Sequence, residues 1–414
     1  MKGDAGVETS QCSRFKATSI TLGLRRFSSA FVIGCALTGC AADLRNAVPI
    51  ELADQVEVVG LEQVRFWGDG ALPNAQHLSE VRLRQIRATR PELLNRKRHQ
   101  KTSFLTLTGG GADGAFGAGF LNGWTATGKR PEFEIITGVS TGSLISLFAF
   151  LGSEYDDQLR EVYTQYSTSD LLQKNIVAGL LGGSAISSSQ PFFSLISQYV
   201  DRRVLAAVAR EHKRGRRLLV GTTNLDVARP VIWNMGRIAE HNSPEALELF
   251  RKVLLASASI PGVFPPVYIN VGLGGRVYKE MHVDGGTTNN VFLLPAKFDF
   301  QKISKRNRLM GRKQLFAIIN TKAEPQPEVV KATTFGIAGR SIATLIKQQT
   351  SGDILRIYLS AKKNGMDFNL ASVPDDFDHI MKEPFDKEYM NALYELGYKM
   401  AYDGYRWRKK PHGI

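Results

Sequence analysis

Cysteine is scarce in this chain. Its 414 residues hold only three, Cys12, Cys35 and Cys40. All three lie near the N-terminus, so the rest of the chain can form no disulfide framework and no cysteine-based metal site, and it offers no thiol nucleophile. The apolar run Phe27–Leu37 is shorter than the roughly 20 residues that a membrane-spanning helix needs. No internal repeat or low-complexity tract is evident, which argues against solenoid architectures.

Acidic residues are also in deficit. The chain has 39 Asp and Glu against 53 Lys and Arg, which gives a net charge of +14 and an isoelectric point of about 9.6. The length permits one large domain with appendages or two small domains. The positive charge favours an anionic partner surface, either a membrane or a nucleic acid. The basic runs are scattered, at residues 96–98, 213–217, 305–308 and 406–410.

The N-terminal segment favours the membrane. Arg25 and Arg26 precede the apolar run Phe27–Leu37, which leads into Leu37-Thr38-Gly39-Cys40. A basic segment, a short apolar core and small residues before a cleavage point are typical of a secretory signal. A buried apolar N-terminal helix is the alternative. An exported chain is not expected to bind nucleic acid.

The sequence Leu-Thr-Gly-Cys also resembles the bacterial lipoprotein signal, in which the cysteine is acylated and becomes the first mature residue. The resemblance implies a signal peptide over residues 1–39 and a lipid anchor at Cys40. It places the protein in the bacterial cell envelope. No acid follows Cys40 directly, which implies the outer membrane, facing the periplasm.

Residues 103–142 carry most of the chemical information. They read as an apolar strand, a glycine loop, a helix, a second strand and the turn Gly138-Val139-Ser140-Thr141-Gly142. This turn fits the nucleophile-elbow pattern G-x-S-x-G, in which a serine is held out between a strand and a helix. Gly138 and Gly142 meet a steric need, because the turn is too sharp for a nearby Cβ. The apolar segment Ser143–Leu151 predicts the helix that leaves the turn.

A glycine loop lies about 30 residues before this serine. Gly109, Gly110 and Gly111 stand where the first strand becomes a helix, so their N–H groups can converge on one point, as an oxyanion hole requires. Gly109-x-Gly111-x-x-Gly114 also fits a dinucleotide-binding fingerprint. That alternative needs an acid near the end of the second strand, but the strand ends in the serine turn. We therefore expect an oxyanion hole.

A serine hydroxyl needs a base to become a nucleophile. Among the seven histidines, His379 could complete a Ser–acid–His order, and His282 lies two residues before Asp284. Asp284 is the favoured base, because it ends an apolar strand and Gly285-Gly286 leave space beside it. Open α/β sheets place their sites at the carboxyl ends of strands, so we expect Ser140 and Asp284 to meet across neighbouring strands.

Together these blocks resemble the patatin-like phospholipases. That family combines a glycine-rich oxyanion loop, a G-x-S-x-G serine and a D-G-G or D-G-A aspartate in a Ser–Asp dyad without histidine. The matching positions are Gly109–Gly114, Gly138–Gly142 and Asp284–Gly286, within a resemblance that covers roughly residues 103–300. The blocks Ala256–Pro266 and Asn289-Asn290 are also similar to the family.

The resemblance implies a serine acyl hydrolase, a phospholipase A or related lipid acyl hydrolase, that releases fatty acids from membrane lipids. Ser140 would be the nucleophile and Asp284 the general base. The expected partners are a phospholipid or other acyl-ester substrate and an anionic membrane surface. No cofactor or metal is expected, since no calcium loop or zinc spacing is present in the sequence.

One position departs from the family pattern. The oxyanion loop of the family usually carries Arg or Lys where this chain has Asp113. An acid that pointed at a developing oxyanion would repel it. We expect Asp113 to face away and to cap the following helix, where an acid suits the helix dipole.

Strands and helices alternate along the chain, and the strands are apolar throughout. This pattern predicts an α/β fold with a mostly parallel central sheet sandwiched by helices, patatin-like, with a strand–nucleophile elbow–helix unit. A helix is expected at residues 77–89 and another at 243–259. Further strands are expected at 216–224, 231–234, 282–284 and 314–320.

The expected divisions are a signal peptide (1–39), a lead-in or linker (40–102), a patatin-like catalytic core (103–300) and a largely helical C-terminal part of the same α/β domain (301–414). The motifs carry no information on oligomeric state. A lipoprotein that keeps the hydrolase fold as an inactive binding or scaffold protein is the main alternative function, because a fold does not dictate an activity.

Overall fold

The computed structural model describes residues 45–94, 101–174, 185, 187–293 and 311–413. The predicted signal peptide and Cys40 lie outside these residues, as do the basic runs at 96–98 and 305–308. Residues 46–414 form one compact unit, which is described below. None of its described helices is both long enough and apolar enough to cross a membrane.

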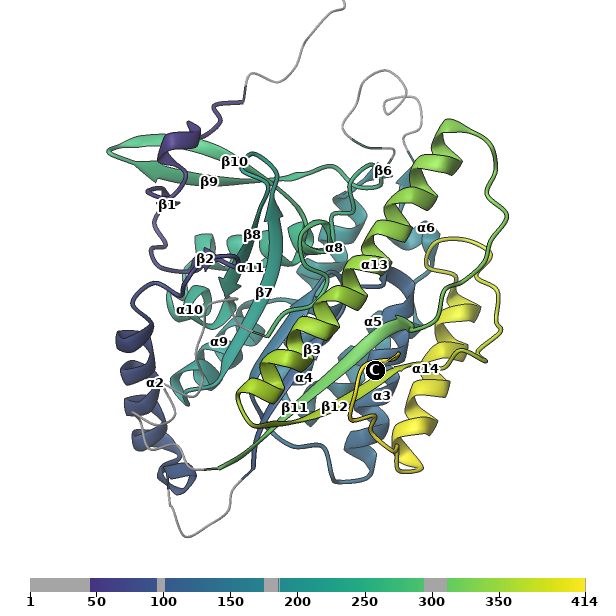
Figure 1. The fold of residues 1–414 in the computed structure, drawn as a ribbon. Helices are drawn as coiled ribbons and strands as arrows, with labels where there is room; N and C mark the ends of the chain where they lie inside the picture. The colour runs from purple at the N-terminus through teal and green to yellow at the C-terminus, as the bar shows by residue number, and fades with distance from the viewer. Residues whose placement is uncertain (1–44, 95–100, 175–184, 186, 294–310, 414) are drawn as a thin grey trace, which may run out of the picture. The chain divides into compact units, whose positions relative to one another are not determined.

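A ten-stranded mixed sheet runs through this unit (Figure 1). Five adjacent strands form its parallel centre, in the order β7 (Arg217–Asn224), β4 (Phe133–Val139), β3 (Lys101–Leu107), β11 (Arg312–Lys322) and β12 (Met366–Val373). These strands are buried on both faces, which explains their continuous apolar sequences. The predicted α/β fold with a mostly parallel central sheet is confirmed.

Antiparallel strands extend the sheet on the β7 side, a feature that the sequence did not indicate. They are β10 (Arg276–Asp284), β9 (Val267–Leu273), β1 (Glu57–Val58), β8 (Arg229–Asn234) and β2 (Arg65–Trp67). A separate pair, β5 (Gln173–Lys174) and β6 (Ser187–Ser188), lies outside this sheet.

Strand β7 has three partners, although a strand has only two hydrogen-bonding edges. β8 pairs with residues 219–224 of β7 and so fills one edge. β4 pairs with residues 217–221 and β10 with residues 222–224, so both must lie on the other edge. β4 and β10 therefore meet end to end along β7.

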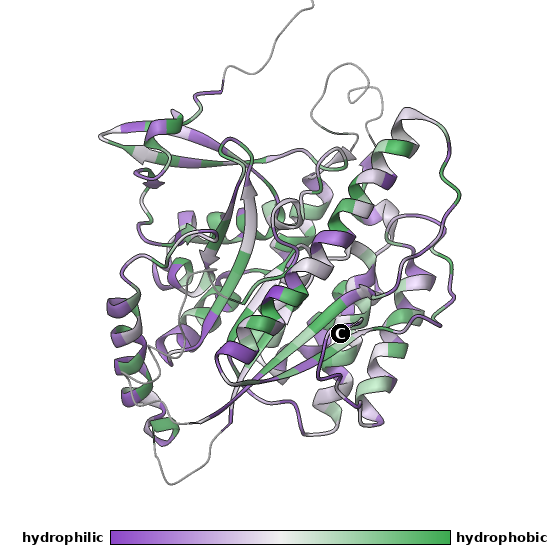
Figure 2. Ribbon diagram, viewed as in Figure 1, coloured by the Kyte–Doolittle hydropathy of each residue, from purple (hydrophilic) through white to green (hydrophobic). Residues whose placement is uncertain are grey.

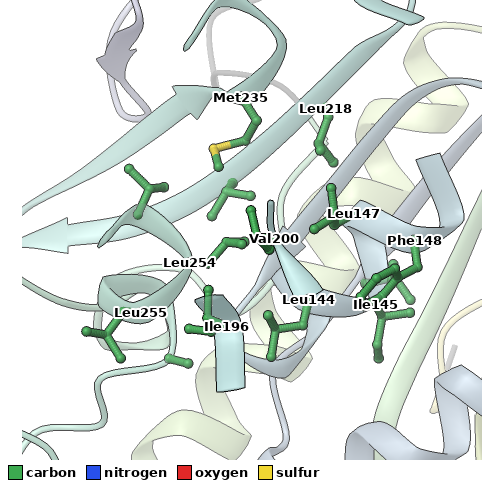
Figure 3. Packing of buried hydrophobic residues seen from close by; sticks show 14 of the residues in the cluster. Leu144, Ile145, Leu147, Phe148, Ile196, Val200, Leu218, Met235, Leu254 and Leu255 are labelled. Atoms are coloured by element: carbon green, nitrogen blue, oxygen red, sulfur yellow. The ribbon is translucent and has the colours of Figure 1, made fainter. Parts of the chain in front are cut away.

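Helices cover both faces of the sheet. The larger core lies on one face, where α3 (Gly114–Ala126), α4 (Thr141–Leu151), α9 (Arg202–Lys213), α11 (Pro244–Ser257) and α14 (Lys387–Tyr402) contribute most of its helical residues. Figure 3 shows Leu144, Leu147 and Phe148 of α4 among neighbours from other segments of this core. On the opposite face, α13 (Thr334–Lys363) packs Ile357, Tyr358 and Ala361 onto the sheet.

The remaining helices connect or flank these layers. They are α2 (Ala75–Thr89), α5 (Asp156–Thr164), α6 (Thr168–Leu171), α8 (Gln190–Tyr199) and α10 (Met235–Glu240), with short 3-10 turns at Ile50–Leu52, Pro91–Leu94, Gly111–Asp113, Ser153–Tyr155 and Gly285–Thr287. Figure 2 shows that α2 and α14 alternate between polar and apolar residues, whereas the central strands are apolar.

Most of the predicted elements are present. α2, α11, β7, β8 and β11 match the segments expected from the sequence to within a few residues, and β10 ends at Asp284 as expected but begins at Arg276. Ser243 caps α11 through a bond from the Ala246 N–H to its hydroxyl, 3.1 Å long. α2 is tied to the sheet by Arg82, which contacts the buried Glu134 at 2.8 Å, and Arg90 reaches the same carboxylate at 2.5 Å.

Helices α3 and α14 approach closely at glycines, which yields a test of the packing. A Cβ added to Gly119 would clash with the carbonyl oxygen of Tyr394. We expect Gly119→Ala to lower the free energy of unfolding by about 3 kcal/mol, because backbone atoms must move to admit the methyl group. Urea denaturation would measure the change.

Gly339→Ala is the matched control. Gly339 also lies inside a helix, but an added Cβ there would meet nothing within 4 Å. This variant should be stabilised by about 0.5–1 kcal/mol through helix propensity alone. Equal effects of the two substitutions would contradict the close approach of α3 and α14.

Candidate active site

Ser140 occupies a strained turn between β4 and α4. Its φ of 55° and ψ of −130° are rare for a residue with a side chain. A Cβ on Gly138 would clash with the carbonyl oxygen of Gly142, and a Cβ on Gly142 would lie 2.5 Å from the carbonyl oxygen of Thr108. Both flanking glycines are therefore required by sterics. The Ser140 N–H donates to Ser257 Oγ over 2.9 Å, which holds the turn in place.

The end-to-end arrangement of β4 and β10 brings Asp284 to Ser140. On the shared edge of β7, Val139 pairs with Gly221 and Asp284 pairs with the next residue, Thr222. The Ser140 hydroxyl, directly after Val139, lies near enough to the Asp284 carboxylate to lower its pKa. The expectation that they meet across neighbouring strands is wrong, because β4 and β10 run toward each other instead of side by side.

Asp284 is held in a buried, polar turn. Its Oδ1 accepts the Gly286 N–H at 2.7 Å, and its own N–H donates to the Ser259 carbonyl at 2.9 Å. Burial raises the pKa of Asp284 to about 7, and the hydrogen bonds from Ser140 and Gly286 offset only part of this rise. A carboxylate with such a pKa is suited to act as a base near neutral pH.

The glycine loop lies against the serine. A Cβ at Gly109 would be 2.9 Å from the Cβ of Ser140. The Gly109 N–H donates to Asn290 Oδ1 at 3.1 Å, so it is already used. The N–H groups of Gly110 and Gly111 have no acceptor within the described residues. Gly110 has a φ of 150°, a conformation that favours glycine. Of the three predicted oxyanion donors, these two are available.

Two buried asparagines hold this loop from outside. Asn290, which accepts the Gly109 N–H, also donates to Thr350 Oγ1 on α13 over 2.6 Å. Asn320, at the end of β11, donates to the Thr108 carbonyl at 2.7 Å and accepts the Gly117 N–H at 3.1 Å. The sequence analysis missed Asn320 as a site residue. The sequence feature that could have identified Asn320 is a polar side chain that directly follows the apolar segment of a strand.

Asp113 occupies the N-cap position of α3, but its side chain makes no capping hydrogen bond, so the predicted cap is wrong. Its carboxylate accepts a hydrogen bond from the hydroxyl of Tyr389 on α14, with an O···O distance of 2.6 Å. A tyrosine donor far along the chain thus takes the place of the helix N–H groups. Burial raises the pKa of Asp113 to about 6, although the bond from Tyr389 and the charges of Lys322 and Lys347 act in the opposite direction.

The histidines considered as bases are engaged elsewhere. His282 is fully buried, with Nδ1 3.0 Å from Thr222 Oγ1 and Nε2 3.0 Å from Glu280 Oε2. His379 is exposed and stacks on Phe377. Within the described part of the chain, no histidine is hydrogen-bonded to Ser140.

An apolar pocket begins at the serine. Gly111, Ser140 and Thr141 form its polar end. The rest is contributed by side chains of α4, α5, α6, α8 and α14, by the turn between α11 and β9 and by Phe385, and it includes Leu144, Leu171, Leu195, Phe264 and Met390. Such a pocket suits an aliphatic chain whose reactive end lies at the hydroxyl.

Comparison with known proteins finds one family model that matches the chain. Residues 105–297 match the family model described as patatin-like phospholipase, a range that contains the glycine loop, Ser140 and Asp284. No curated protein sequence matches the chain.

Among solved structures, VipD from Legionella pneumophila is similar at 11% identity and a TM-score of 0.37, over 74% of this chain and 66% of that one. Human GIVD cytosolic phospholipase A2 is similar at 12% identity and a TM-score of 0.34, over 80% of this chain and 54% of that one. The chain thus spans less than two thirds of either protein.

The raised pKa of Asp284 predicts how stability depends on pH. Between about pH 4 and pH 7 the unfolded chain releases this proton while the folded protein keeps it, so folding loses stability as the pH rises. Asn mimics the protonated acid and does not titrate. The stability of Asp284→Asn relative to the parent should therefore increase by about 4 kcal/mol from pH 4 to pH 7.

Denaturant unfolding of both proteins at several pH values would measure this. Asp113 titrates in the same range in both proteins, so its contribution cancels in the difference. A difference that stays constant with pH would show that Asp284 has an ordinary pKa.

Proposed function

We propose that this protein, whose residues 105–297 match the patatin-like phospholipase family model, is a serine acyl hydrolase that releases fatty acids from membrane lipids through a Ser140–Asp284 dyad. One observation carries the proposal. A strained serine lies beside a buried carboxylate whose pKa is raised to about 7, next to a glycine loop with two N–H groups that have no acceptor among the described residues.

The first half of the reaction forms an acyl-enzyme. Asp284 takes the proton from Ser140 Oγ as that oxygen attacks the ester carbonyl carbon. The carbonyl oxygen becomes an oxyanion that the N–H groups of Gly110 and Gly111 stabilise, at roughly 3 kcal/mol for each donor. The bond from the carbon to the leaving oxygen then breaks, and Asp284 returns the proton to that oxygen. The alcohol part of the lipid departs.

Water completes the cycle. It attacks the acyl carbon while Asp284 accepts its proton, and the bond to Ser140 Oγ breaks as the proton passes back to that oxygen. The fatty acid leaves and the dyad is restored. Asp284 suits both roles because a base and acid with a pKa near neutrality exchanges protons readily in each direction.

The apolar pocket would hold the acyl chain, with a phospholipid or another lipid ester as substrate. We propose further that residues 1–39 are a signal peptide and that Cys40 is acylated, which would anchor the protein at the periplasmic face of the outer membrane. The net charge of +14 would favour an anionic lipid surface.

The dyad can be tested directly. Ser140→Ala and Asp284→Asn should each lower the release of fatty acid from phospholipid by at least about 10³-fold, as expected when a nucleophile or its base is removed. Phospholipids labelled separately at the sn-1 and sn-2 chains, with products identified by mass, would measure the loss and the position cut. A fluorophosphonate probe should label the parent and leave Ser140→Ala unlabelled.

Ser143→Ala is the matched control. Ser143 is a buried serine one turn into α4, and its hydroxyl donates to the Ser140 carbonyl. Its loss should leave probe labelling in place. A folded parent protein that neither reacts with the probe nor hydrolyses any lipid ester would favour the inactive scaffold instead.

The pocket predicts a chain-length effect. Leu195→Trp adds bulk to a lining position on α8, so hydrolysis of 16-carbon esters should fall by about tenfold or more in kcat/KM. Butyrate esters, which need only the polar end of the pocket, should change by less than about threefold. Equal losses for both esters would show that the acyl chain lies elsewhere.

A further inference from the structure

Within the described part of the chain, most side chains of the first three turns of α13 are exposed. Ile337, Ile342 and Leu345 are 54%, 38% and 69% exposed. At about 100° per residue they lie within an arc of roughly 140°. Ile337 and Leu345 are each about 140° around the axis from the buried Thr350, whereas Ile342 is only about 20° from the buried Asp353. In Figure 1 this helix continues well past the end of β11. We call residues 334–345 the α13 projection.

An apolar helix in this position is costly in water. Helical turns without tertiary contacts are only marginally stable, and exposed apolar side chains gathered on one face usually mark a surface that something covers. The N-terminus of α13 is nevertheless capped, since Thr333 Oγ1 accepts the Gly336 N–H at 3.1 Å.

Positive charges predominate on the projection and its flanks, although Lys347 donates to the Glu324 carbonyl in the preceding loop. Residues 329–352 contain Lys331, Arg340 and Lys347 and no Asp or Glu. Arg340 reaches back to Glu328, at 3.0 Å, in the preceding loop. Apolar side chains with flanking cations complement a lipid surface, where acyl chains lie beneath phosphate groups.

The projection is close to the serine site along a continuous chain of contacts. Thr350, five residues after Leu345, accepts a hydrogen bond from Asn290, which in turn holds the Gly109 N–H. Five residues of helix span about 8 Å. The exposed apolar surface thus begins about one and a half turns from Thr350, which binds the asparagine that holds the glycine loop.

We propose that the α13 projection docks on an anionic phospholipid bilayer and sets the serine site against the lipid. The proposal rests on the lipid hydrolase function proposed above. Ile337 and Leu345 enter the acyl region, with Ile342 at its edge, while Lys331 lies at the phosphates. A second copy of the chain suits this surface less, because two-fold pairing sets each surface against itself and brings the same cations together.

The test measures vesicle binding separately from catalysis. It uses the full chain with Cys40→Ser, so that no lipid is attached, and Ser140→Ala, so that the vesicles stay intact. Sedimentation with phosphatidylcholine vesicles, with and without phosphatidylglycerol, gives the partition coefficient. We expect Leu345→Ser to lower it about tenfold, and phosphatidylglycerol to raise it about fivefold for each cation that reaches the phosphates.

Leu359→Ser is the matched control. Leu359 lies on the same helix, is 56% exposed and sits about 40° from Leu345 around the axis, but four turns further on. Its loss should change the partition coefficient by less than about twofold. In chains that keep Ser140, both variants should hydrolyse a soluble short-chain ester at the parent rate.

Three results would overturn the proposal. Leu345→Ser could bind vesicles as well as the parent, or Leu359→Ser could lose binding equally. Alternatively, Leu345→Ser could turn a dimer into a monomer in sedimentation velocity without changing vesicle binding, which would assign the surface to a second copy. Normal vesicle binding by a chain that retains Ser140 yet hydrolyses no ester would contradict the proposed function alone.

Discussion

The shared edge of β7 is the constraint on which the site depends. β8 fills one edge, so β4 and β10 must divide the other, and neither can lengthen by a residue without displacing its counterpart. Ser140 follows the last paired residue of β4, and Asp284 is the last paired residue of β10. Backbone hydrogen bonds therefore set the separation of the hydroxyl and the carboxylate, which need not rely on flexible side chains for their alignment.

The glycine loop is positioned by residues on both sides of the predicted boundary at residue 300. Asn290 precedes it, whereas Asn320 and Thr350 follow it, and all three belong to the contacts that hold Gly109 and its neighbours. The family match ends at residue 297. The loop that would stabilise an oxyanion is thus supported by β11 and α13, beyond the matched range, and these elements belong to the physical description of the site.

The sequence was informative where local sterics dictate the structure. Gly138 and Gly142 could be predicted to flank the serine because no other residue fits that turn, and apolar segments located the strands. Strand direction was not predictable, because a buried strand has the same apolar pattern whether it is parallel or antiparallel. The partner of Asp113 was not predictable either. Tyr389 lies 276 residues away and reaches it only through the packing of α14 on α3.

Two carboxylates on β10 show what sets the pKa of Asp284. Glu280, four residues earlier, is also buried, yet its pKa is lowered to about 2, because hydrogen bonds from His282 and Arg65 and the charge of Arg65 outweigh its desolvation. Asp284 receives only the neutral donors Ser140 and Gly286, so desolvation dominates and its pKa is raised to about 7. Within the described residues, Glu280 differs from Asp284 in having His282 and the cationic Arg65 as hydrogen-bond donors. A guanidinium beside Asp284 would stabilise the charged carboxylate and lower its pKa, which would stabilise the fold but make Asp284 a weaker base. Burial without a cation destabilises the charged carboxylate, and the same effect allows it to accept a proton from a serine at neutral pH.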